Sequence, residues 1–212
     1  MIVVGITGSL ASGKSEVARL MKLKGARVFD ADAAARKALK KRQPAYRAAV
    51  KIFGKSYLKK NGELDRKKLK ERVFGHPGDL RKLNILIHPG VIFECLSLIK
   101  KSRHEKGLLV LDVPLLFESK MDCLADHLVV VTSPDKALLK RAAKKGISPK
   151  LARKILASQW PVKRKIKRAD FVIKNDGSTA DLRKKVSEVW LKIMKVSNLK
   201  GVVRRRSPRK GE

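Results

Sequence analysis

The segment from Gly8 to Ser15 constrains the fold of this chain more than any other feature. It has the sequence Gly-Ser-Leu-Ala-Ser-Gly-Lys-Ser and fits the phosphate-binding loop (P-loop) pattern G-x-x-x-x-G-K-[ST]. The glycines let backbone N–H groups turn toward phosphate oxygens, and the following helix points its positive end at the same anion. Residues 2–6 precede the loop as an apolar strand, and residues 16–24 follow it as an amphipathic helix ending at Gly25. Strand, loop and helix stand in the order that a nucleotide-binding loop needs.

Four further short apolar runs predict buried parallel strands, because helical patterns separate most of them. The runs lie at residues 27–29, 108–111, 127–131 and 171–173. The sequence therefore predicts an α/β fold in which a parallel five-stranded sheet is flanked by helices. Ligands in such sheets bind at the carboxyl ends of the strands, where the loop and the acidic residues Asp30, Asp32 and Asp112 all lie.

We expect residues 1–198 to form a single domain that consists of a sheet core and two helical additions. The core is assigned to residues 1–32, 104–133 and 169–198. Residues 33–103 are mostly helical and too long for a simple crossover, so they are predicted to form an inserted substrate-binding region. Residues 134–168 contain a helical hairpin rich in Lys and Arg, which we interpret as a lid. Residues 199–212 form a basic tail that is expected to be disordered.

Local signals place several helix boundaries inside these additions. Asp65 is predicted to cap a helix over residues 66–74. Residues 79–103 indicate a long helix that is interrupted around Pro89, because proline lacks the N–H group that a helix interior requires. In the lid region, a helix is expected to start at Asp135 and to be followed by a second helix over residues 150–159.

The net charge is the unusual feature of the composition. Lys and Arg number 52 against 19 Asp and Glu, which gives a formal charge of +33. Such a surface attracts polyanions, including nucleic acid and anionic membranes. The excess runs along almost the whole chain, and aromatic residues make up only 5% of it. We therefore interpret the charge as solvated helix faces and expect no specific nucleic-acid partner, because aromatic stacking platforms are missing from the basic segments.

Other parts of the composition bear on location. The longest strongly apolar stretch, residues 108–117, is too short to cross a membrane and contains Asp112 and Pro114. Cys95 and Cys123 have neither metal-site spacing nor the pattern of a disulfide framework. We expect a cytoplasmic protein with no membrane partner. No motif specifies an oligomeric state.

The residues at the strand ends suggest phosphoryl-transfer chemistry. Lys14 can reach the β- and γ-phosphates of ATP, and the Ser15 hydroxyl can ligate Mg²⁺. Asp32 could orient an attacking hydroxyl and accept its proton, or it could cap a helix over residues 33–40. Asp112 could hold Mg²⁺ through water or simply cap its strand. Arg36, one helical turn after Asp32, could pair with that carboxylate or bind a substrate phosphate.

Asp30 is expected to be structural or to contact magnesium-bound water. The lid offers six cations, of which we expect two or three to reach phosphate: Lys140, Arg141, Lys144, Lys145, Arg153 and Lys154. His88 stands out among the histidines because Pro89 follows it, and it could be structural or contact a substrate.

The motifs taken together are specific. They are Gly5-Ile-Thr-Gly-Ser-Leu-Ala-Ser-Gly-Lys-Ser15, Asp30-Ala-Asp32 with Arg36, Leu86-Ile-His-Pro89, Asp112-Val-Pro-Leu-Leu-Phe-Glu118, Gln159, and Ala169-Asp-Phe-Val-Ile-Lys-Asn175 with Gly177. In this order the chain resembles the dephospho-coenzyme A kinase family over roughly residues 1–195. The resemblance implies a P-loop kinase fold with a helical substrate-binding insert and a lid. It also implies transfer of the ATP γ-phosphate to the ribose 3′-hydroxyl of dephospho-coenzyme A, the last step of coenzyme A synthesis, with Mg²⁺.

The resemblance also implies roles for individual residues. Asp32 becomes the catalytic base, and Lys14 with Mg²⁺ the electrostatic stabiliser; Ser15 and, through water, Asp112 are the candidate metal contacts. The candidate ATP-binding residues are Gly8, Ala11, Ser12, Gly13, Lys14, Ser15, Glu16, Lys140, Arg141, Lys144 and Asn175, with Asn175 near adenine. The candidate residues for dephospho-coenzyme A are Asp32, Arg36, His88, Leu115, Leu116 and Phe117.

The chain departs from the family pattern in two places. Glu16 stands where the family often has Thr, and Lys140, Lys144 and Lys154 stand where the lid usually has arginine. Lysine is a point charge without the bidentate fork of arginine. Two alternatives stay open. One is a kinase of this fold that acts on another small molecule or nucleotide, and the other is a nucleic-acid-binding P-loop ATPase, suggested only by the charge.

Overall fold

The computed structural model describes residues 1–200, and their side chains as far as residue 196. Apart from residues 199 and 200, which end the last helix, the predicted basic tail lies outside the described residues.

A parallel five-stranded sheet forms the centre of the molecule, as predicted. Its strands are β1 (Ile2–Gly8), β2 (Arg27–Asp30), β3 (Leu108–Asp112), β4 (His127–Thr132) and β5 (Phe171–Lys174). They lie in the order β2-β3-β1-β4-β5, and every neighbouring pair is parallel. Strand β1 is therefore central, and its carboxyl end carries the P-loop. Parallel strands of this kind are buried on both faces, which explains why they are continuous apolar runs in the sequence.

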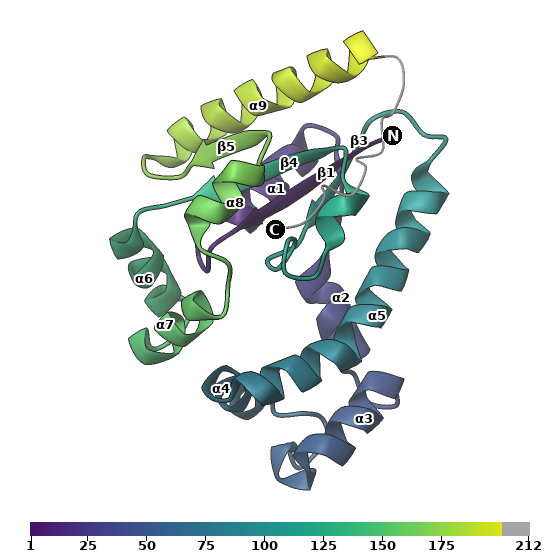
Figure 1. Cartoon of the computed structure of the whole chain (residues 1–212), viewed down its shortest axis with the longest axis vertical. Helices are drawn as coiled ribbons and strands as arrows, with labels where there is room; N and C mark the ends of the chain where they lie inside the picture. The colour runs from purple at the N-terminus through teal and green to yellow at the C-terminus, as the bar shows by residue number, and fades with distance from the viewer. Residues whose placement is uncertain (201–212) are drawn as a thin grey trace.

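Side chains alternate between two hydrophobic clusters on the two faces of the sheet. Val4 and Ile6 of β1 belong to the cluster that includes α1 (Lys14–Leu23) and α9 (Thr179–Lys200). Val3 belongs to the other cluster, which contains much of the inserted helical region. In Figure 1, α9 lies alongside β5 at one end of the molecule, while the inserted helices extend away at the other.

Four α-helices lie between β2 and β3: α2 (Ala31–Ala38), α3 (Pro44–Phe53), α4 (Arg66–Gly75) and α5 (Pro77–Ser102), with a short 3₁₀ turn at Lys55–Tyr57. Asp65 caps α4 as predicted, since its carboxylate accepts hydrogen bonds from the N–H groups of Lys67 and Lys68 at 3.1 Å. The predicted interruption at Pro89 is wrong, because α5 continues through this residue. Figure 1 shows α5 changing direction part-way along. A proline that cannot donate to the preceding turn bends a helix without ending it when the flanking turns are well packed.

Within residues 1–200, α5 is the helix whose length and apolar composition would allow it to cross a membrane, a test that core helices of globular proteins also pass. Leu83, Ile87, Val91 and Cys95 form its buried stripe, and the helix contacts α2, α3 and α4. One face of α5 is therefore packed within the insert, while Ile85, Phe93 and Leu96 remain exposed.

The segment between β4 and β5 forms α6 (Asp135–Lys144), α7 (Pro149–Ala157) and α8 (Val162–Arg168). We call α6 and α7 the lid hairpin. Helix α7 contacts α4 of the insert, whereas α8 contacts β4 of the sheet. A 3₁₀ turn at Met121–Leu124 connects β3 with β4.

Candidate active site

A cavity of about 1230 Å³ lies at the carboxyl end of the sheet. The P-loop, α2, α4, α5, the segment after β3 and the lid hairpin all contribute to its walls. Typical pockets for one ligand have volumes of roughly 300–1,000 Å³. The cavity is therefore large enough for two ligands, with the P-loop on one side and the inserted helices on the other.

The P-loop has the backbone geometry that an anion site requires. Gly13 has a φ of 96°, and Ala11, with a φ of 57°, is also in the left-handed region. A Cβ atom on Gly13 would overlap the side-chain amide of Asn175, so glycine is required there for space as well as for conformation. Helix α1 begins at Lys14, two residues before the predicted start, and the N–H groups of Glu16 and Val17 donate to the Gly13 carbonyl at 3.0 Å.

Asn175 holds the P-loop in place. Its side-chain amide donates to the carbonyl of Ser12 at 2.8 Å, across 163 positions of the chain. Arg141 of the lid hairpin donates to the Ser133 hydroxyl at 2.9 Å and to the Asn175 carbonyl at 3.3 Å. Both predicted ATP contacts, Asn175 and Arg141, thus line the cavity and are linked to the loop.

Lys14 forms a buried ion pair with Asp112 at the floor of the cavity. Lys14 lines the cavity, whereas Asp112 lies behind it and does not. The Asp112 carboxylate therefore orients the Lys14 side chain. The sequence had suggested two other roles for Asp112, a magnesium contact through water and a strand cap, but not this one. The ion pair uses one oxygen of the Asp112 carboxylate, which is almost completely buried.

Asp32 lies in the first turn of α2 and lines the cavity. The prediction that it could cap this helix is wrong, because the cap is Asp30, whose carboxylate accepts from the Ala33 N–H at 2.8 Å. The predicted pairing of Arg36 with Asp32 is also wrong, since Arg36 lies 3.6 Å from the Asp30 carboxylate. Asp32 is thus left free to act on a ligand, and Arg36 lines the cavity beside it.

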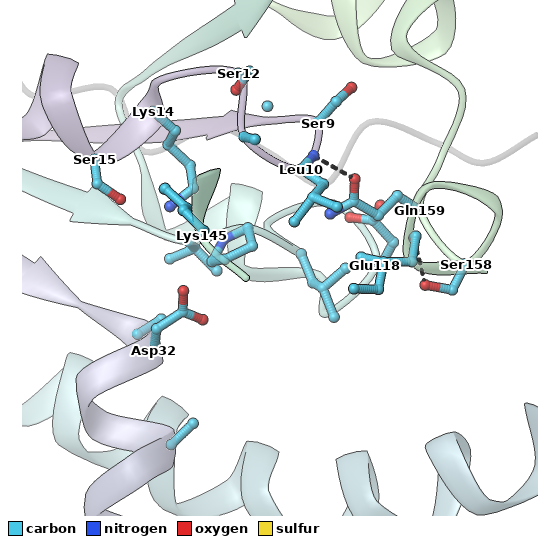
Figure 2. A pocket seen from close by; sticks show the side chains of 18 of the residues that line it. Ser9, Leu10, Ser12, Lys14, Ser15, Asp32, Glu118, Lys145, Ser158 and Gln159 are labelled. Atoms are coloured by element: carbon cyan, nitrogen blue, oxygen red, sulfur yellow. Dashed lines mark hydrogen bonds between the residues drawn. The ribbon is translucent and has the colours of Figure 1, made fainter. Parts of the chain in front are cut away.

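The environment of Asp32 suits a base. The surrounding cavity walls remove solvation from the carboxylate and so raise its pKa, although water in the cavity still reaches the side chain. Lys14 acts in the opposite direction, and Asp30 and Asp112 add to the increase in pKa. In Figure 2, Lys14 and Asp32 point into the same part of the cavity, and Lys145 is drawn between them.

The predicted substrate contacts divide into two groups. His88 and Leu115 line the cavity, and burial lowers the pKa of His88, which favours its neutral form. Leu116 and Phe117 do not line it, because both are in the core. Phe117 stacks on Trp160 with ring centroids 5.7 Å apart. The contiguous Leu-Leu-Phe run had suggested one common surface, but the chain turns there and directs its side chains to different places.

Three of the six lid cations line the cavity: Arg141, Lys144 and Lys145. Lys140 is exposed and does not line it, and neither does Lys154. The α6 helix can direct only one face toward the cavity, so adjacent basic residues at its other face remain in solvent.

Several cavity residues were not singled out from the sequence as candidate contacts. Arg19 donates two hydrogen bonds to Glu16, at 2.7 and 2.8 Å, which lower the pKa of Glu16. The i,i+3 spacing of this pair was a usable signal. Arg66 and Lys70 of α4 also line the cavity, but nothing distinguishes them among the many basic residues of the sequence.

The oxygen donors near the P-loop fit Mg²⁺. Ser15 is exposed and lines the cavity, and Asp112 lies behind Lys14. The described residues contain no cluster of three or more His, Cys, Asp or Glu that could hold a metal. Mg²⁺ commonly takes only one or two protein ligands, with water and substrate phosphates completing its shell.

Comparison with known proteins places this site in a family. The family model described as dephospho-CoA kinase matches residues 2–181. The chain belongs to the dephospho-CoA kinase family. Among curated relatives, the dephospho-CoA kinase of Carboxydothermus hydrogenoformans is 40% identical over 193 residues, covering 90% of this chain and 93% of the relative. That of Fusobacterium nucleatum is 41% identical, with 88% and 95% covered. The chain is therefore a kinase.

Solved structures agree with this membership in the dephospho-CoA kinase family. The dephospho-CoA kinase from Campylobacter jejuni is 30% identical and superposes with a TM-score of 0.67, covering 92% of this chain and 98% of that one. A Thermus thermophilus protein is 33% identical, with a TM-score of 0.72 and coverage of 91% and 97%. Shikimate kinase from Acinetobacter baumannii, at 15% identity and a TM-score of 0.51, shares the fold alone.

Proposed function

We propose that this kinase transfers the γ-phosphate of ATP to the ribose 3′-hydroxyl of dephospho-coenzyme A and so forms coenzyme A. The observation that carries the proposal is the position of Asp32, which lines a two-ligand cavity on the side opposite the P-loop. Family membership supports the choice of acceptor. On this assignment the P-loop side takes ATP and the inserted helices take the acceptor.

Asp32 is the base of this reaction. Its carboxylate accepts the proton of the 3′-hydroxyl as the hydroxyl oxygen attacks the γ-phosphorus, and the bond from that phosphorus to the β,γ-bridging oxygen breaks to release ADP. The raised pKa of Asp32 brings its basicity closer to neutral pH than that of an ordinary aspartate. The α2 helix holds the carboxylate without using it as a cap, since Asp30 has that function.

The opposite wall stabilises the transferring phosphoryl group. Lys14, oriented by Asp112, supplies a fixed positive charge, and Lys144 and Lys145 contribute further charge from the lid hairpin. When bound, Mg²⁺ neutralises charge on the β- and γ-phosphates. Ser15 would hold it directly, and Asp112 would hold it through water.

Asn175 and Arg141 are the residues that we assign to the adenine side of ATP, and His88, Arg36 and Leu115 those that we assign to the acceptor. We also infer a cytoplasmic location, consistent with the free thiols of Cys95 and Cys123.

An acceptor screen tests the proposed function. The purified chain is incubated with ATP and Mg²⁺ and with dephospho-coenzyme A, adenosine or a nucleoside monophosphate, and products are identified by mass and by the position of the new phosphate. We expect 3′-phosphorylated product from dephospho-coenzyme A. Phosphorylation of a nucleotide with dephospho-coenzyme A untouched would support the alternative of another small-molecule kinase. ATP hydrolysis that depends on nucleic acid would support the P-loop ATPase.

A further inference from the structure

Helix α4 directs one stripe of side chains into the cavity. The stripe consists of Arg66, Leu69, Lys70, Val73 and Phe74. Their spacing of three and four residues places them on one face of the helix. Both cations, Arg66 and Lys70, lie in the first half of the stripe with Leu69 between them, and Val73 and Phe74 follow. This wall of the cavity is therefore basic near the start of α4 and apolar near its end.

Lys70 is a half-buried cation without a partner. Among the described residues no hydrogen bond or ion pair of its ammonium group is found within 4 Å. Burial lowers the pKa of Lys70, and the carboxylate of Asp32 acts in the opposite direction. Lys70 lines the same cavity as Asp32 but forms no ion pair with it. A lysine that lines the cavity without an ion-pair partner keeps its three N–H donors for an anionic ligand.

Arg66 fixes the basic end of the stripe to the wall that carries Asp32. Its guanidinium donates to the backbone carbonyl of Arg36 at 3.1 Å. This bond uses one of the five donors of the guanidinium, and the remaining donors are available to a ligand. Arg66 and Lys70 are thus presented beside α2 on the side of the cavity away from the P-loop.

We infer that Arg66 and Lys70 bind the 5′-diphosphate of the acceptor. The inference rests on the proposed function and extends it to residues outside the motifs described above. In dephospho-coenzyme A the diphosphate is attached through C5′ to C4′, the ring neighbour of the carbon that carries the 3′-hydroxyl. When Asp32 holds that hydroxyl, the diphosphate must lie close to the same wall. Without cations there, the diphosphate would be repelled by Asp30 and Asp32.

The apolar end of the stripe extends this assignment. Val73 and Phe74 of α4 face the cavity together with Leu80 and Leu83 of α5. The arm that follows the diphosphate in this acceptor carries a gem-dimethyl group and is largely uncharged. It would continue from the two cations along these apolar side chains, which can bury it from water.

Substitution of Lys70 tests the inference. Lys70→Met keeps the apolar stem and removes the charge. A charge-assisted hydrogen bond contributes enough that its loss should raise the KM for dephospho-coenzyme A about tenfold or more. The KM for ATP should change less than about twofold, because the ATP phosphates lie at the P-loop, and Lys70→Arg should restore most of the acceptor affinity. Lys67→Met on the same helix is the control, since Lys67 is exposed and does not line the cavity.

Adenosine provides a second comparison because it has the 3′-hydroxyl without the diphosphate. The preference for dephospho-coenzyme A over adenosine in kcat/KM should decrease in Lys70→Met, and Arg66→Met should act in the same direction. An unchanged acceptor KM, an equal rise in the KM for ATP, or a loss confined to kcat would overturn the inference. If Lys70→Met does not fold, Lys70→Gln replaces it. Wild-type protein that leaves dephospho-coenzyme A untouched would instead defeat the proposed function.

Discussion

Lys14 depends on a residue far away in the sequence for its position. Asp112 binds the ammonium group from behind, and Lys14 itself lines the cavity. A preorganised charge of this kind needs little rearrangement when phosphoryl transfer begins. The same ion pair is buried at the floor of the cavity, so Lys14 also contributes to the stability of the fold. A test of Lys14 in catalysis therefore has to measure folding separately.

Lys14→Ala should lower kcat by about 10²-fold or more, the usual cost of losing an electrostatic stabiliser. The measurement is steady-state kinetics at saturating ATP and acceptor. Because Asp112 loses its ion-pair partner in this variant, thermal melting checks that the protein is folded at the assay temperature. Lys22→Ala is the control, since Lys22 is exposed on the same helix. A kcat equal to that of wild type would remove Lys14 from the mechanism.

Asp32→Asn should reduce transfer by about 10²–10⁴-fold, the range expected for loss of a general base. Nucleotide affinity should persist, because the proposed mechanism has Asp32 act on the acceptor and not on ATP. Asp30→Asn is the matched control, since asparagine caps a helix as well as aspartate does. Both variants are compared by ATP titration and by kcat. Loss of ATP binding in Asp32→Asn, with transfer intact per folded molecule, would show that Asp32 has a structural role only.

The raised pKa of Asp32 predicts the pH dependence. The base works as the carboxylate, so activity should fall as pH falls through a pKa that lies above the ordinary aspartate value of about 3.9. The positive charge of Arg36 lowers the pKa of Asp32. Arg36→Gln should therefore move the acid limb of the kcat/KM profile to higher pH. A shift to lower pH, or an acid limb that Asp32→Glu does not move, would contradict this assignment.

Among the secondary-structure elements, α8 connects the lid hairpin to the rest of the site. Lys165 of this helix is fully buried, and its ammonium group lies 2.9 Å from Glu118, in the segment after β3. Glu118 also accepts a hydrogen bond from the N–H of Trp160 at 2.7 Å. The neighbouring Gln159 accepts from the N–H of Leu10 in the P-loop at 3.1 Å, as Figure 2 shows. The base of the lid hairpin is thus attached to both the P-loop and the segment after β3.

Removing one partner of this buried pair should be costly. Lys165→Met leaves Glu118 without its counter-charge and should destabilise the fold by about 3–5 kcal/mol. The double variant Lys165→Met with Glu118→Gln should cost less, since no uncompensated charge remains. Urea unfolding of both, with Lys163→Met as an exposed control on the same helix, measures the difference. Equal stabilities for the single variant and the wild type would show that the pair contributes nothing.

For the molecule as a whole, the +33 charge is expected to assist encounters with anionic substrates without defining a nucleic-acid function. Association with ATP and acceptor should weaken as salt shortens the Debye length from about 10 Å at 0.1 M. RNA or DNA binding should be non-specific and steeply salt-dependent, because it would rest on phosphate neutralisation. Deleting residues 202–212 should reduce that binding and leave kinase activity nearly intact.

Filter binding and kinase assays on the full and truncated chains at two salt concentrations measure these effects. Binding that selects a sequence and resists salt would show that the charge has a nucleic-acid function after all. Loss of transfer on truncation would assign the tail to the catalytic machinery, although it lies beyond every motif used to locate the active site.

Local patterns in the chain were sufficient for the sheet and the P-loop. A strand buried on both faces must be a short apolar run, and Gly13 has a φ of 96° that glycine adopts more readily than other residues. Both requirements involve only neighbouring residues, so they can be recognised without knowing the rest of the fold. The same holds for the cap at Asp65, which acts on N–H groups two and three residues away.

The roles of most cavity side chains depended instead on contacts that the sheet order and helix packing create. Lys14 and Asp112 are 98 positions apart and meet because β1 and β3 are neighbours. Helix α2 starts two residues before the predicted start, so its cap is Asp30 and not Asp32. A turn after β3 separates Leu115, which lines the cavity, from the buried Leu116 and Phe117. In the sequence Lys70 cannot be distinguished from many similar lysines, and only the packing of α4 shows that it lines the cavity. Side-chain partnership is a property of three-dimensional proximity, and only the tertiary structure supplies it.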